Sequence, residues 1–181
     1  MPANPQKPIN LAFFLLFIPV AYASYLFHEL GHWTVGEILG NHMVYSLNSV
    51  WPKDGHYAHA SHDLYVSIGG PAFSILQATL ALLIVERYNE LYAYPFAFFP
   101  AFNRFFSLLL GGFMKQDEAR ISAILGIGIY VVAIVVLVIL LSIVMRCSHQ
   151  LRIGFRNNMY ILTVSTACQL LVIGTYKLLP L

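Results

Sequence analysis

The sequence predicts an all-α polytopic membrane protein with about five transmembrane helices and a polar loop or short β-hairpin after the first. Of its 181 residues, 59% are hydrophobic and only 10% are charged. The mean hydropathy of +0.70 lies far outside the range of soluble domains. The net charge of +2 is too small, and the lysines and arginines are too scattered, to indicate a nucleic-acid-binding surface. Two isolated cysteines, Cys147 and Cys168, predict neither a disulfide scaffold nor a zinc knuckle.

The first apolar run, residues 9–40, is longer than the roughly 20 residues that one crossing needs. We expect its later part, residues 28–39, to continue as helix beneath the membrane surface or to line a polar cavity. A secretory signal is the alternative, because Lys7, an apolar stretch and Ala21-Tyr22-Ala23 resemble one with its cleavage site. The apolar run continues past those residues, which favours a membrane helix.

The polar interval that follows, residues 41–63, predicts a short hairpin or an irregular loop. Residues 43–50 have the alternation of one strand, and we hypothesise that it pairs with an extended substrate backbone. His56, His59 and His62 recur at every third position in this interval. They could bind a second metal or sense pH, although loop histidines are more often simply solvated.

Four further apolar runs cover residues 64–86, 95–114, 121–145 and 157–179. The first contains Gly69-Gly70-Pro71, which lets a neighbouring helix or a substrate approach closely, or forms a packing kink. The second contains two prolines and ends at Gly111-Gly112, so we expect a bent or broken helix. The last two contain no carboxylate and no intramembrane histidine, which is typical of scaffold. We expect one membrane domain, with residues 1–120 as its metal-binding core and residues 121–181 as two accessory helices.

The segment His28-Glu29-Leu30-Gly31-His32 lies at the end of the first apolar run. On a helix, positions i and i+4 share one face, so both imidazoles can reach one zinc ion while Glu29 lies beside its water. Ionisable residues within a membrane span are costly, and no cationic side chain lies near these three in the sequence. The pattern therefore favours a metal site over a cluster of polar side chains that only hydrogen-bond to one another.

A zinc ion held by two histidines needs a third protein ligand and an open water position to be catalytic. If three spans cross in turn, the third emerges on the side where His32 leaves the membrane, at Asp117. We therefore choose Asp117 as the third ligand, with Glu118 in reserve. In the alternative interpretation, this carboxylate pair balances Lys115 and Arg120 or caps the following helix.

These motifs resemble the site-2 protease family of intramembrane zinc metalloproteases. The resemblance covers about the first 120 residues: the His-Glu-x-Gly-His segment, the Gly-Gly-Pro segment of the next span, and an aspartate after a later one. It implies that His28, His32 and Asp117 hold zinc and that Glu29 activates water. It also implies that the substrates are transmembrane protein segments, which unwind in the bilayer to reach the metal. We accordingly expect a multi-pass protein of a bacterial or archaeal cell membrane.

The chain departs from the family pattern at two positions. Ser74 stands three residues after Pro71, where the family usually has asparagine, and Glu118 stands where a glycine usually follows the ligand aspartate. A divergent branch is indicated, with Gly69, Gly70, Pro71 and Ser74 as structural or substrate-contacting residues. The alternatives are a membrane zinc hydrolase of a non-protein substrate and a non-catalytic metal-binding regulator. The intact Glu29 favours an enzyme, because a binding site alone would not need a base.

Overall fold

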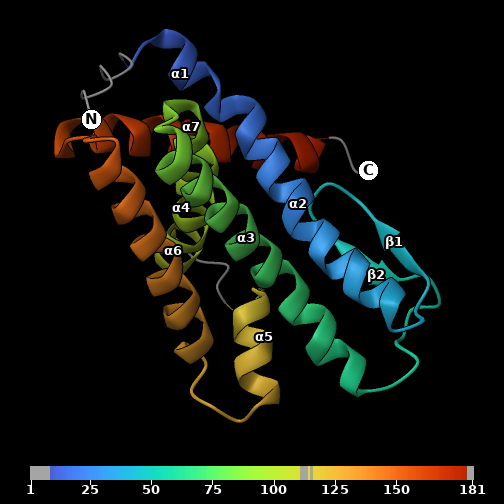
Figure 1. The fold of residues 1–181 in the computed structure, drawn as a ribbon. Coiled ribbons are helices and arrows are strands. Elements are labelled where there is room, and N and C mark those ends of the chain that lie inside the picture. Colours follow the sequence, from blue (N-terminus) through green and yellow to red (C-terminus); the bar gives the residue numbers. More distant parts are fainter. Residues whose placement is uncertain (1–8, 111–113, 115, 179–181) are drawn as a thin grey trace.

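The computed structural model describes residues 9–110, 114 and 116–178. Helices form most of the chain, with one small hairpin after the second (Figure 1). The elements in order are α1 (Leu11–Leu15), α2 (Phe17–Ile38), β1 (Met43–Tyr45), β2 (Val50–Pro52), α3 (Ser61–Tyr88), the 3-10 turn η1 (Leu91–Ala93), α4 (Tyr94–Leu110), α5 (Asp117–Ile124), α6 (Val131–Gln150) and α7 (Phe155–Leu178).

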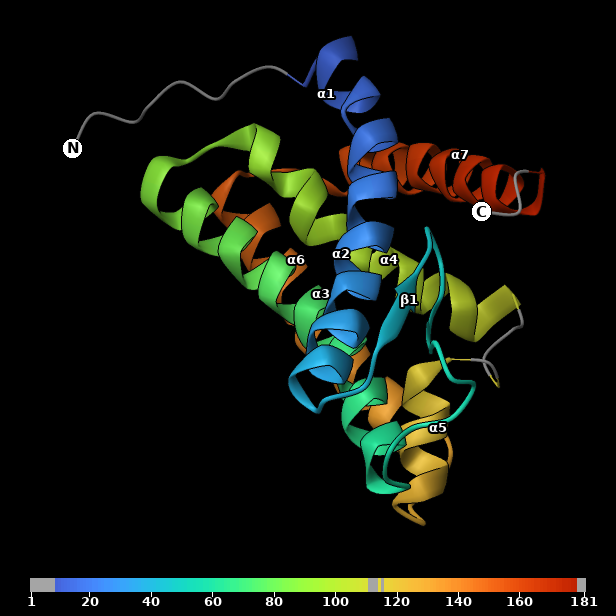
Figure 2. The same cartoon turned by 90° about the vertical axis from the view of Figure 1, so that its right-hand side faces the viewer.

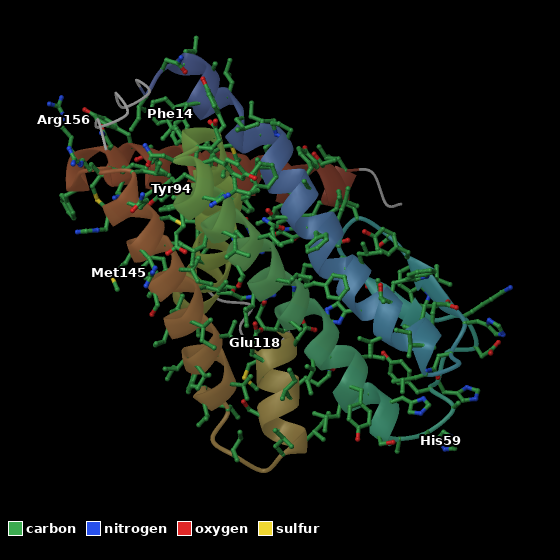
Figure 3. All side chains as sticks on the ribbon, in the orientation of Figure 1. Phe14, His59, Tyr94, Glu118, Met145 and Arg156 are labelled. Carbon is green, nitrogen blue, oxygen red and sulfur yellow. The ribbon has the colours of Figure 1, made fainter. Side chains whose placement is uncertain are left out.

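Four helical segments in the described part of the chain are long and apolar enough to cross a membrane: Leu11–Ile38, Ser61–Tyr88, Val131–Gln150 and Phe155–Leu178. Their outer faces carry large apolar side chains, and Met145 on α6 points away from the bundle in Figure 3 with 66% of its surface exposed. The remaining predicted span corresponds to α4. Its 17 residues give a length of about 25 Å, which is less than the roughly 30 Å of a bilayer core. The expected count of about five spans is therefore not confirmed.

The first two long helices touch through their backbones. A Cβ atom on Gly31 of α2 would lie 2.7 Å from the carbonyl carbon of Gly69 on α3, and one on Gly69 would lie 2.8 Å from that of Gly31. Only glycine allows this approach, which resembles small-residue packing in membrane helix pairs. Pro71 lies inside α3, which continues as helix from Ser61 to Tyr88.

The polar interval forms an antiparallel hairpin in which Met43 faces Pro52 and Tyr45 faces Val50. The single strand predicted over residues 43–50 is thus wrong in extent. The Ser46 N–H donates to the Ser49 carbonyl at 2.9 Å, which closes a turn and places Val50 in β2. The hairpin lies beside α2 (Figure 2), and the Tyr45 hydroxyl donates to the Leu26 carbonyl near the middle of that helix at 2.5 Å.

The apolar run predicted over residues 121–145 divides into two helices. The short α5 ends at Ile124, and α6 begins only at Val131. Gly126 lies between them with a φ of +67°. Residues other than glycine rarely adopt this backbone conformation, so the chain can turn there. The last helix, α7, crosses α2 at a steep angle in both Figures 1 and 2.

Candidate metal centre

The two motif histidines lie on the buried face of α2, one helical turn apart. Their Nε2 atoms are 3.2 Å apart. The Asp117 Oδ2 atom, from the first turn of α5, lies 3.0 Å from Nε2 of His28 and 3.2 Å from Nε2 of His32. Three ligand atoms from residues 28, 32 and 117 thus converge within 4.8 Å of one another, and this group could hold a metal ion.

Each imidazole is oriented by a partner at its other nitrogen. Nδ1 of His32 donates to the Val66 carbonyl of α3 at 2.6 Å, so in the neutral imidazole Nε2 carries the lone pair. Nδ1 of His28 lies 2.9 Å from the Ser74 hydroxyl of α3. Metal-ligating histidines almost always have such an outer partner. Nε2 of His32 and Oδ2 of Asp117 each lie within 3.2 Å of Nε2 of His28, so one bound cation could contact all three atoms.

Glu29 is buried beside the two histidines, with 8% of its surface exposed. It lines the same cavity as they do. Within the part of the chain that the structure describes, its carboxylate has no hydrogen-bond partner. The carboxylate is therefore free to exchange a proton with a molecule in the cavity.

Gly70 provides the space in which the two imidazoles lie. A Cβ atom at this position would lie 2.5 Å from Nε2 of His28 and would also collide with Nε2 of His32. Carbon and nitrogen atoms in ordinary contact are about 3.5 Å apart. The second glycine of the Gly-Gly-Pro segment is therefore required by the side chains of the site, whereas Gly69 is required by the backbone of α2.

Asp117 is ionised at neutral pH. Burial alone would raise the pKa of this carboxyl group, but hydrogen bonds with His28 and His32 and their positive charge hold it well below its usual range. The carboxylate is thus available as an anionic ligand.

Arg104 of α4 is a buried cation beside the site that the sequence analysis did not find. Its Nη2 atom lies 2.8 Å from Nδ1 of His28, and its Nη1 atom donates to Gln116 at 2.8 Å. Its Nε atom lies 3.0 Å from Oε1 of Glu118. Arg104 therefore holds the residues on both sides of Asp117. The signal in the sequence was a charged residue inside an apolar run, which in a membrane protein indicates a functional site.

Glu118, the reserve ligand, pairs with this arginine and does not join the three ligand atoms. Only 1% of its surface is exposed, and Figure 3 shows it inside the bundle at the N-terminal end of α5. Since Asp117 itself begins α5, the helix predicted to start near Ile121 starts four residues earlier. Gly111 and Gly112, expected to end the preceding span, lie outside the described residues.

A cavity of about 550 Å³ contains the site. The motif residues, Asp117 and Arg104 form one part of its wall, and the hairpin turn from Asn48 to Val50 forms another. The last helix also lines it, through Gln169, Ile173 and Tyr176. This helix was expected to be scaffold, because it contains no carboxylate and no histidine.

The three loop histidines do not form a second metal group among the described residues. Nδ1 of His56 contacts the Asp54 carbonyl at 2.9 Å, and the buried His62 contacts the Asn41 amide at 3.0 Å. His59 lies at the outer end of the loop before α3 (Figure 3). The hypothesis of a metal site there is not supported by this geometry.

Comparisons with protein-family models, with curated proteins and with solved structures find no match to this chain. The geometry of the site therefore carries the functional inference.

Proposed function

We propose that this chain is an intramembrane zinc metalloprotease that hydrolyses peptide bonds of transmembrane proteins. The observation that carries the proposal is the convergence of His28, His32 and Asp117. The two histidines and the free carboxylate of Glu29 lie on a helix long and apolar enough to cross a bilayer, and the short helix α5 supplies Asp117. Two histidines and one carboxylate with an open position form a ligand set of catalytic zinc sites.

The charges of the buried cluster support a divalent cation. Glu29 and Glu118 are buried and Asp117 is half-buried. These three carboxylates contribute three negative charges when ionised, and Arg104, which pairs with Glu118, contributes one positive charge. The net charge is therefore −2 when both histidines are neutral and zero when both are protonated. Uncompensated charge in an apolar interior is strongly unfavourable. A divalent metal ion would neutralise the cluster.

The protein's own residues have distinct roles in this proposal. Zinc would supply a Lewis acid that makes water acidic near neutral pH and polarises the carbonyl of the bond to be cut. Glu29 takes the proton from water and later gives it to the leaving amine. Ser74 and the Val66 carbonyl keep the imidazoles in the orientation that ligation needs.

Metal content tests the proposal directly. Detergent-purified wild type should contain about one zinc ion per chain, measured by elemental analysis. His28→Ala and Asp117→Ala should lose it, whereas the loop variant His56→Ala should keep it, because His56 is exposed and outside the site. A folded wild type without zinc after incubation with excess metal would overturn the proposal.

A second experiment separates the protease from its rivals. Glu29→Gln should retain zinc and lose cleavage of candidate membrane proteins, detected as new protein fragments in reconstituted vesicles. Zinc retention with no cleavage by wild type of any membrane protein offered would favour a non-protein substrate or a metal-binding regulator.

A further inference from the structure

The cavity extends from the three candidate metal ligands to a second group of polar side chains, which we call the amide cluster: Tyr25 of α2, Asn103 of α4 and Gln169 of α7. The Nε2 atom of Gln169 lies 2.5 Å from the Tyr25 hydroxyl oxygen and 3.2 Å from Oδ1 of Asn103, and it donates to both. Three helices that are distant in sequence thus meet at one amide, in the wall of the cavity that contains Glu29.

The amide cluster has hydrogen-bonding capacity that the described residues do not use. Gln169 is 3% exposed, and its Oε1 atom is buried without a partner. The Tyr25 hydroxyl accepts from Gln169, and its own hydrogen has no acceptor among the described residues. The Nδ2 group of Asn103 likewise has no acceptor there. Buried polar atoms are nearly always hydrogen-bonded, so the Gln169 oxygen requires an explanation. Tyr25 and Asn103 are only half-buried, so their unused donors can be reached from the cavity.

One acceptor beside two donors is the complement of an amide group, which has one N–H and one carbonyl. A transmembrane helix keeps its backbone amides bonded internally, and it exposes them only where it unwinds. The same cluster would bind the side-chain amide of Asn or Gln. An acyl chain offers no hydrogen-bonding atom, so this part of the cavity is poorly suited to the hydrocarbon part of a lipid.

We propose that the amide cluster is a substrate subsite, which binds an amide group of a transmembrane segment and selects segments that carry an asparagine or glutamine in the bilayer core. The identity of the occupant as a peptide rests on the proposed function. Ile173 and Tyr176 continue the cavity wall on the same helix and contact the apolar neighbours of that residue.

Peptide binding tests the subsite without requiring turnover. Glu29→Gln protein in nanodiscs would be titrated with two fluorescent Leu/Ala peptides of roughly 21 residues, identical except for one central Asn or Leu. The Asn peptide should bind about fivefold more tightly, as expected for one additional net hydrogen bond. Gln169→Leu should abolish the difference.

Two further variants control for folding and position. Tyr25→Phe removes one hydroxyl, keeps the ring and should reduce the preference for Asn. Leu170→Ala alters the neighbouring position on α7, whose side chain is 57% exposed, and should leave the preference unchanged. Equal affinity for the two peptides, or a preference that survives both Gln169→Leu and Tyr25→Phe, would overturn the subsite. Displacement of the Asn peptide by a short-chain phospholipid as effectively as by unlabelled peptide would also overturn it.

Zinc content measured on the same samples separates the two proposals. A peptide preference in protein without zinc would leave the subsite standing while the protease proposal fails. Zinc-loaded protein with no peptide preference would refute the subsite alone.

Discussion

Replacing Gly70 by alanine should disrupt the metal centre while leaving most of the fold intact. The new Cβ atom would lie 2.5 Å from Nε2 of His28, and ordinary contact is about 3.5 Å, so the imidazole must move by about 1 Å. Metal–ligand distances vary by only about 0.2 Å. Moving α3 away by the same distance would open its backbone contact with α2 at Gly69. Losing a residue that only orients a metal ligand lowers metal affinity by up to about a hundredfold. Displacing a ligand itself should cost more, so we expect zinc affinity to fall at least about a hundredfold.

The assay is competition for zinc between the purified variant and a chromogenic chelator, together with unfolding in detergent. Overpacking should cost about 1–3 kcal/mol of stability. Gly174→Ala is the matched control, because no atom lies within 4 Å of its added Cβ, and it should bind zinc as wild type does. Wild-type zinc affinity in Gly70→Ala would refute the inference that the two imidazoles are held beside Gly70 to bind metal.

Three further predictions concern the surroundings of the site. Ser74→Ala should weaken zinc binding about tenfold in the same competition assay, whereas Ser142→Ala, whose hydroxyl bonds only within α6, should not. Arg104→Gln and Glu118→Gln should each lower the free energy of unfolding by about 3–5 kcal/mol, because each leaves a buried charge unpaired. The double variant should lose less than the sum of the two, and additive losses in denaturant titrations would argue against the pair. Gly31→Ala should destabilise the protein by about 1–3 kcal/mol through collision with the backbone of α3, and an unchanged midpoint of unfolding would contradict that contact.

Several features of the site could be predicted because they follow from local geometry or simple topology. The spacing of His28 and His32 places them on one helical face wherever the helix lies. Counting alternate crossings placed Asp117 on their side, and the structure brings its carboxylate within 3.2 Å of both imidazoles. The counting took α4 as the third crossing, which is not confirmed; in the structure α4 nevertheless returns the chain to the end of the bundle where the histidines lie.

Other features depend on pairings that no local pattern specifies. Arg104 of α4 pairs with Glu118 of α5, and nothing in the sequence around either residue identifies its partner. Gln169 lies in an apolar run of the sequence. The hydropathy of such a run does not show whether its few polar side chains line a cavity, as Gln169 does, or pack against a neighbouring helix. Hydropathy also cannot distinguish a helix buried in protein, such as α4, from a helix that crosses the membrane, because both environments favour apolar side chains.

The contact between Gly31 and Gly69 has a consequence for how the cavity can open. Because the two backbones touch without intervening side chains, there is no rotamer change by which α2 and α3 could slide or separate slightly. The imidazoles, Glu29, and the Val66 and Ser74 groups that orient the imidazoles all belong to these two helices. We therefore expect these groups to move together. Widening that admits a peptide should then come from the other elements that border the cavity, among them the hairpin turn and α7.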